Sequence, residues 1–135
     1  MNNNLYLFLL STYVNLSQLL KDTVFQILHD VPGKISITFD GWTSPSDEHY
    51  IVFTAHWITA DFVKRDCVLD FLHIADSQTA EYLREISLLA LKDFGISRKV
   101  LGLTADGVPA VIKSIRLLLP QLKLERTKKG GADGE

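Results

Sequence analysis

Residues 34–44 (KISITFDGWTS) constrain the fold of this chain more than any other stretch. Apolar and polar side chains alternate from position 35 to 39, and this period of two is typical of a strand with one apolar face. Asp40 stands where this strand is expected to end, and Gly41 permits a bend just beyond it. A carboxylate held at the end of a rigid strand suits metal-dependent chemistry. The alternative is an aspartate that starts a turn by accepting hydrogen bonds from the neighbouring backbone.

Length, charge and cysteine content narrow the class of protein. A chain of 135 residues has room for one domain with one core. The net charge of −2 gives no whole-chain support for a nucleic-acid partner, although a local basic face is compatible with it. The single cysteine, Cys67, excludes an internal disulfide framework and fits a reducing compartment. The apolar run at 5–10 is far shorter than the roughly 18 residues of a membrane span, so we expect a soluble intracellular protein.

Three segments have the apolar spacing of helices. They are residues 5–28, a segment from a cap within 76–79 to Phe94, and a segment from Pro109 to Pro120. Asn15 or Ser17 offers a break, so the first segment predicts one or two helices. Gly95 is suited to end the second helix, and Pro120 is expected to stop the third. The polar residues 120–135 are then expected to form a disordered tail.

Three further segments beside the opening strand are typical of strands. They are residues 49–58, 62–74 and 99–105. The first two are joined by a link short enough for a hairpin. In the second, Cys67, Leu69 and Phe71 are expected on one face. The third is almost wholly apolar, which predicts a strand buried on both faces in the centre of a sheet.

This order of elements predicts an α/β fold of the ribonuclease H type. A three-stranded antiparallel meander is followed by a helical crossover to a parallel strand. Asp40 and Asp106 then end two different strands. If those strands are neighbours, the two carboxylates lie at one edge of the sheet and can share a cation. We expect an N-terminal helical segment at 1–33 and a partial core at 34–119 before the tail.

Four stretches resemble the hAT superfamily of DNA transposases and their BED-type zinc-finger relatives. They are residues 35–44 (ISITFDGWTS), 50–58 (YIVFTAHWI), 68–73 (VLDFLH) and 102–106 (GLTAD). The resemblance implies a ribonuclease H-like core that cleaves and joins DNA with two Mg²⁺ or Mn²⁺ ions held by an Asp, Asp, Glu triad. Asp40 matches the first catalytic aspartate and Asp106 the second. It also implies a nuclear protein with DNA as partner.

The chain departs from the family pattern in ways that bear on activity. The third carboxylate of the family lies further along on a later helix, and Glu125 and Glu135 are poor substitutes for it. The turn at 107–110 (GVPA) replaces an Asn-rich turn, and Gln78 stands where relatives often carry a histidine. We expect the chain to lack the zinc finger and the C-terminal region through which relatives dimerise.

These departures predict a truncated core whose ancestral role is metal-dependent DNA cleavage and strand transfer and which is inactive alone. Two alternatives stay open. One is a non-enzymatic, domesticated module that binds DNA or protein. The other is a nuclease of the same fold that acts without transposition.

The remaining candidates have ordinary structural interpretations beside the functional ones. Lys113, Arg116, Lys123 and Arg126 either form a solvated helix face or contact DNA phosphates. Trp42 is expected to pack against the turn after Asp40 and fix that carboxylate, rather than to stack on bases. The three strand histidines lack zinc-ligand spacing and are expected to be structural; they are His49, His56 and His73.

Overall fold

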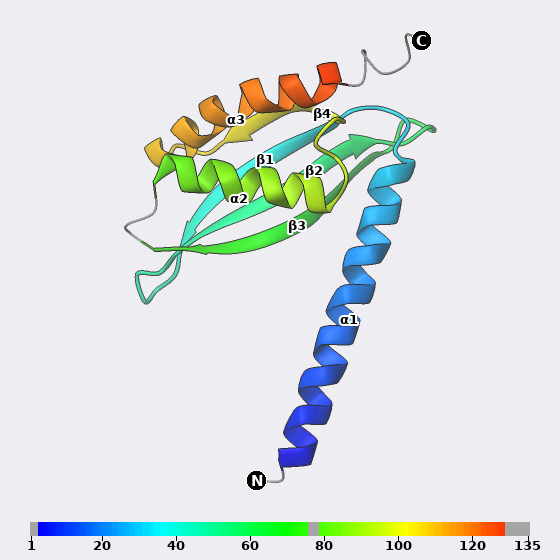
Figure 1. Ribbon diagram of the computed structural model, residues 1–135, viewed down its shortest axis with the longest axis vertical. Helices are drawn as coiled ribbons and strands as arrows, with labels where there is room; N and C mark the ends of the chain where they lie inside the picture. Colours follow the sequence, from blue (N-terminus) through cyan, green and yellow to red (C-terminus); the bar gives the residue numbers. More distant parts are fainter. Residues whose placement is uncertain (1–2, 76–78, 129–135) are drawn as a thin grey trace.

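The computed structural model describes residues 3–75 and 79–128, which form a four-stranded sheet and three helices (Figure 1). In chain order the elements are α1 (Asn3–Asp30), β1 (Ile35–Thr43), β2 (His49–Ile58), β3 (Lys64–Ile74), α2 (Ala80–Asp93), β4 (Val100–Ala105) and α3 (Pro109–Thr127). None of these helices is long and apolar enough to cross a membrane.

The sheet has the predicted topology. Its order is β3-β2-β1-β4, with antiparallel pairing from β1 to β2 and from β2 to β3, and parallel pairing between β1 and β4. The helix α2 provides the crossover from β3 to β4, and α2 and α3 lie side by side on the same face of the sheet (Figure 1). The predicted meander, parallel strand and flanking helices are therefore confirmed.

The core lies between that face and the two helices. The inward residues of β1 are buried together with Ile51 and Phe53 of β2, and the Phe39 and Phe53 rings meet edge to face with centroids 4.7 Å apart. From the helices the core receives Leu83, Leu91, Val111, Ile115, Leu118 and Leu122. The alternating apolar side chains of β1 are thus buried on one face of the strand, while its polar side chains lie on the other face.

Strand β1 extends past the expected end at Asp40. It runs to Thr43 because β2 continues to pair with it, Asp40 facing Val52 and Thr43 facing His49. What ends at this point is the parallel pairing with β4, whose last pair is Phe39 with Ala105. The prediction that the strand ends at Asp40 was therefore wrong for its pairing with β2 and correct for its pairing with β4.

Helix α3 does not stop at Pro120. It continues to Thr127, so the predicted disordered tail at 120–135 was wrong over its first eight positions, 120–127. Leu118 and Leu122 are each 1% exposed, and their burial holds the helix on both sides of the proline. Proline removes the hydrogen bond that would reach the carbonyl of Arg116, but both residues are exposed, so water can satisfy that carbonyl. Residues 129–135 lie outside the described part of the chain.

A shift of register in β3 moves Phe71 to the opposite face from Cys67. Cys67 pairs with Ala55 and Val68 with Thr54, but Phe53 pairs with Asp70, so Leu69 is an additional residue in β3. The prediction of one shared face for Cys67, Leu69 and Phe71 was therefore wrong. The bulge places Phe71 on the face of the sheet away from α2 and α3.

Strand β4 pairs only with β1 among the described residues, so it is an edge strand rather than a central one. A register shift occurs where Ile35 pairs with Val100 and Ser36 with Gly102, which leaves Leu101 unpaired and 66% exposed. The apolar composition of β4 had predicted burial on both faces, and this was wrong because the helices cover one face only.

The second helix begins and ends at the predicted residues. Thr79 is its N-cap and accepts a hydrogen bond from the N–H of Tyr82, while Gly95 follows the C-cap Phe94 with φ of +68°. The other predicted cap candidates, Asp76 to Gln78, lie outside the described residues. Helix α1 is continuous, so neither Asn15 nor Ser17 breaks it.

Lys99 joins the end of α1 to the start of β4. Its Nζ donates hydrogen bonds to the carbonyl oxygens of Leu28, His29 and Val31 at 3.0, 2.6 and 2.9 Å. Leu28 and His29 lie in the last turn of α1, whose carbonyls have no N–H partner within the helix, and Val31 follows just after its end. A cation at this end also interacts favourably with the helix dipole.

We predict that Lys99→Met lowers the free energy of unfolding by about 2 kcal/mol, because three carbonyls lose a charged donor while the aliphatic stem is kept. Urea unfolding followed by circular dichroism measures this. Lys123→Met removes the same charge from an exposed site on α3 and is expected to change stability by less than about 0.5 kcal/mol. Equal midpoints for the two variants would contradict the role assigned to Lys99.

Candidate functional site

The parallel pairing of β1 and β4 brings Asp40 and Asp106 to adjacent backbone positions. Each follows directly on the last residue pair of the parallel ladder, and the N–H of Asp106 donates to the carbonyl of Phe39 at 3.2 Å. Neighbouring strands lie about 4.8 Å apart. Strand alternation in β1 places Asp40 on the face away from the helices, since Phe39 points into the core. The condition set by the sequence analysis, that these two strands are neighbours, is therefore met.

The two carboxylates have different surroundings. Asp40 is exposed, and its carboxylate has no hydrogen-bond or ion-pair partner among residues 3–75 and 79–128. The Asp106 carboxylate accepts a hydrogen bond from the N–H of Gly107 at 2.9 Å, and its carbonyl accepts one from Val108 at 2.6 Å. The turn interpretation considered for Asp40 therefore describes Asp106. Its carboxylate is held by its own turn, while that of Asp40 is free to bind.

Gly41 allows the chain after Asp106 to approach β1 closely. A β-carbon placed on Gly41 would lie 3.1 Å from Cγ2 of Val108. This distance is shorter than an ordinary van der Waals contact. The absence of a side chain at Gly41 therefore allows Val108 to lie close to β1. The sequence offered Gly41 only as a bend; its contact with Val108 depends on the parallel register and could not be read from spacing.

An aromatic cluster lies beside Asp40 on the open face of the sheet. Tyr50 and Phe71 are stacked with centroids 4.8 Å apart, and Trp42 lies 5.5 Å from Tyr50 and 6.1 Å from Phe71. Trp42 was expected to pack against the turn after Asp40; it packs instead across the sheet on Tyr50 and Phe71 and remains 52% exposed. Because Asp40 and Trp42 are two residues apart in β1, both lie on the same face.

A cleft of about 280 Å³ opens next to this position. Its lining is mainly apolar and comes from the end of β1, the start of β2 and the first turn of α3, with Trp42, Ile51, Val108 and Val111 among its residues. The cleft adjoins the chain that carries Asp40 and Asp106 without including either carboxylate.

The donor set fits a hard divalent cation. Mg²⁺ is commonly held by one or two carboxylates while water and substrate phosphates complete its octahedron. In the described part of the chain no group of three or more His, Cys, Asp or Glu side chains gathers as a metal site. Glu125 lies on α3 and pairs instead with Lys92 and Lys128, at 3.7 and 3.6 Å. Glu135 is outside the described residues, as is Gln78.

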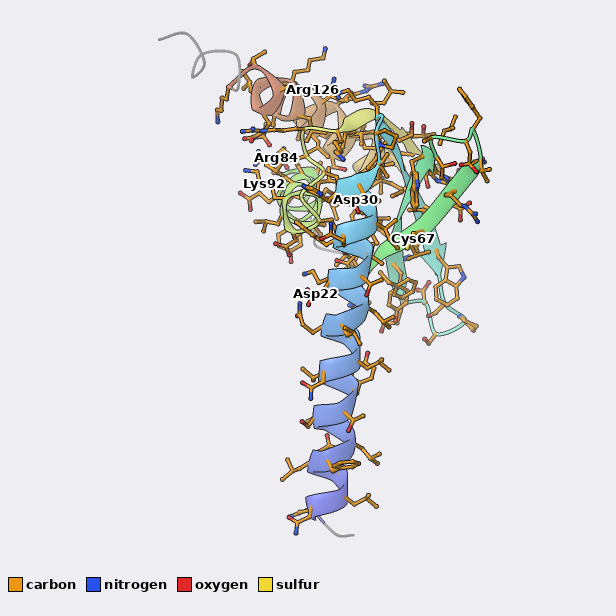
Figure 2. All side chains as sticks on the ribbon, turned by 90° about the vertical axis from the view of Figure 1, so that its right-hand side faces the viewer. Asp22, Asp30, Cys67, Arg84, Lys92 and Arg126 are labelled. Carbon is orange, nitrogen blue, oxygen red and sulfur yellow. The ribbon has the colours of Figure 1, made fainter. Side chains whose placement is uncertain are left out.

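The predicted basic residues are exposed on α3, and none of them forms an ion pair with Asp40 or Asp106 among the described residues. Lys113 pairs with Glu81 at 3.7 Å. The N–H of Glu81 and the Lys113 charge hold the pKa of the Glu81 carboxyl below its usual range. Arg116, Lys123 and Arg126 have no ion-pair partner among the described residues. Arg126 lies near the far end of α3 (Figure 2), about 26 Å along the helix from Pro109.

The three strand histidines have individual partners. His49 interacts with Thr43 and His56 with Thr38, at 3.1 and 3.0 Å, and His73 pairs with Glu48. Each partner lies on a neighbouring strand or in the loop between β1 and β2. The predicted structural role of these histidines agrees with these contacts.

Sheet order and helix placement together define a ribonuclease H-like α/β domain. Residues 38–132 match the family model described as the ZBED1 RNase-like domain, and the chain belongs to this family. The predicted kinship with hAT-type transposases and BED zinc-finger proteins is confirmed.

Relatives with transposase and zinc-finger names share this region. The chain is 28% identical over 90 residues to a putative AC transposase of Zea mays, covering 67% of this chain and 11% of the relative. It is 27% identical over 115 residues to the zinc finger BED domain-containing protein DAYSLEEPER of Arabidopsis thaliana, covering 85% of this chain and 16% of the relative. A putative transcriptional regulator, tpeD of Talaromyces stipitatus, is 30% identical over 74 residues, covering 55% of this chain and 9% of the relative. The chain thus spans less than a fifth of the length of each relative.

We predict that Phe71→Ala lowers the free energy of unfolding by about 1–2 kcal/mol, because Tyr50 and Trp42 lose an aromatic neighbour. It should also shift the fluorescence of Trp42 towards that of a water-exposed indole. Phe62→Ala is the matched control, since Phe62 is 88% exposed in the β2–β3 turn. If the two variants behave alike, the cluster contributes nothing to stability.

Proposed function

We propose that this chain is the first part of a transposase-derived core in which Asp40 and Asp106 together hold one Mg²⁺ or Mn²⁺ ion and present it to DNA. The observation that carries this proposal is the parallel register, which places both aspartates directly after the last pair of β1 and β4. Two carboxylates side by side repel each other, and a divalent cation between them removes that repulsion.

In this proposal the chain binds metal and DNA without cutting DNA. Metal-assisted phosphodiester cleavage needs the ion and the attacking oxygen to be positioned closely, and two carboxylates leave much of the coordination sphere to water. A third carboxylate from a longer polypeptide or a partner would complete the site. The bound ion would polarise a phosphate oxygen, while Asp40 and Asp106 would fix its location on the open face of the sheet. The transposase names of the maize relatives support this chemistry.

A second candidate is a non-enzymatic, domesticated module that binds DNA or protein in the nucleus. The observation that favours it is the relative described as a putative transcriptional regulator, which matches 74 residues of this chain. The two candidates differ in the metal: a regulatory module needs no ion at Asp40 and Asp106.

Manganese broadening tests the metal site. In ¹H–¹⁵N spectra of the whole chain, Mn²⁺ is expected to broaden the amides around Asp40, Gly41, Asp106 and Gly107 first, because a paramagnetic ion acts over a short range. Asp40→Asn and Asp106→Asn should each abolish this selectivity, whereas Asp66→Asn, an exposed β3 aspartate, should preserve it. Uniform broadening in the wild type, or retention in either site variant, would refute the proposed ion site and favour the regulatory module.

Salt dependence tests whether the basic residues of α3 contact DNA phosphates, as the sequence allows. Replacing Arg116, Lys123 and Arg126 with Gln is expected to reduce the slope of log K against log salt by about 3, close to one per lost phosphate contact. Lys34, Lys64 and Arg65, replaced together, give the same charge change at exposed sites outside α3 and should leave the slope nearly unchanged. Fluorescence anisotropy with a DNA duplex provides the measurement. Equal slopes for both triple variants would exclude α3 as the contact surface.

A further inference from the structure

Helix α1 carries a large apolar surface that no described element covers. The helix projects from the domain with its N-terminus at the far end (Figure 1), and the side chains along its N-terminal half point into open space around it (Figure 2). Leu28 is its only buried residue. No charged side chain occurs among residues 3–20. A surface of this kind marks an interaction site.

Part of this surface follows a seven-residue repeat. Intervals of three and four residues connect a set of side chains over three heptads, which we call the α1 seam: Tyr6, Leu9, Tyr13, Leu16, Leu20, Thr23 and Ile27. Its six apolar members are between 47% and 68% exposed. A repeat of 3.5 residues keeps one stripe in contact with a partner helix along a supercoil.

The α1 seam is largely separate from the side of α1 that contacts the domain. On that side Leu28 is buried, Val24 packs against the core, and Lys21 pairs with Asp93 at 3.4 Å. Leu20 alone of the seam also borders the domain, in a shallow cleft beside Phe94. The polar member, Thr23, donates its hydroxyl to the carbonyl of Leu19 at 2.8 Å, so it brings no unsatisfied donor to the seam.

We propose that the α1 seam pairs with the α1 seam of a second copy of this chain. The six positions that flank the seam are uncharged: Leu10, Thr12, Ser17, Leu19, Val24 and Gln26. Charged residues at such positions favour a partner helix of opposite charge and oppose pairing between identical helices. Because the flanking positions of α1 carry no charge, neither preference applies here. The complementary surface for an uncharged heptad stripe is therefore another such stripe, which the same chain provides.

The size of the contact is consistent with a stable pair. The seam extends over about 33 Å of helix at 1.5 Å per residue. A helix pair of that length buries on the order of 1,200 Å², at the lower end of specific interfaces. The family model begins at residue 38, after α1, so this pairing is separate from the matched region.

Sedimentation velocity on the whole chain tests the proposal. The wild type is expected to sediment with twice the chain mass, and dilution should dissociate it. Leu9→Lys with Leu16→Lys places charges in the seam and should give a monomer, with the affinity between copies lowered at least about 100-fold. The matched control, Ser11→Lys with Gln18→Lys, adds the same charges on the opposite side of the helix and should remain a dimer.

Three outcomes would overturn the proposal. They are a monomeric wild type, equal dissociation of both double variants, and a wild type that binds phosphatidylcholine vesicles while remaining monomeric without them. Far-UV circular dichroism of the two variants at equal concentration confirms that the domain is folded in each. Because Asp40 and Asp106 are unchanged, the manganese experiment should give the same result in the monomeric variant, so the two proposals fail independently.

Discussion

The parallel pairing of β1 with β4 is the constraint on which the rest of the structure depends. It begins where the N–H of Ile35 donates to the carbonyl of Lys99 at 2.9 Å, and it ends where the N–H of Asp106 donates to Phe39. A parallel strand requires a crossover, and α2 provides it on the face where α3 also packs. This one pairing therefore decides which face is covered, where the core lies and which residues meet at the end of the ladder.

The candidate site is a direct consequence of where that ladder stops. Phe39 and Ala105 form the last residue pair of β1 with β4, and the residue after each of them along the chain is an aspartate. Beyond that point β1 pairs only with β2 among the described strands. In this site Asp40 lies on a rigid strand and Asp106 lies in a hydrogen-bonded turn. Gly41 allows these two segments to lie close together.

Local pattern was sufficient for most of the elements, and it failed where a distant contact overrode it. The period of two in residues 35–39 and the composition of 49–58 predicted strands because each strand has one buried face. The end of α3 was not predictable from Pro120, since the burial of Leu118 and Leu122 against the sheet outweighs one lost hydrogen bond. Phe71 was misplaced because a bulge in β3 is a property of strand pairing and leaves no local signal. For the same reason the aromatic cluster beside Asp40 could not be predicted.

The two proposed surfaces lie at opposite ends of β1, and this separation makes them compatible. Lys99 fixes the C-terminus of α1 at the beginning of β1, near Ile35, while Asp40 lies five residues further along the strand, about 17 Å away at 3.3 Å per residue. Helix pairing along the α1 seam would therefore join two copies through their N-terminal helices and leave both aspartate pairs open. Because Lys99 holds α1 by hydrogen bonds to three carbonyls at its end, the direction in which the helix leaves the domain is fixed by the same junction that starts the β1–β4 ladder. The geometry of the assembly and that of the candidate metal site thus depend on opposite ends of one pair of strands.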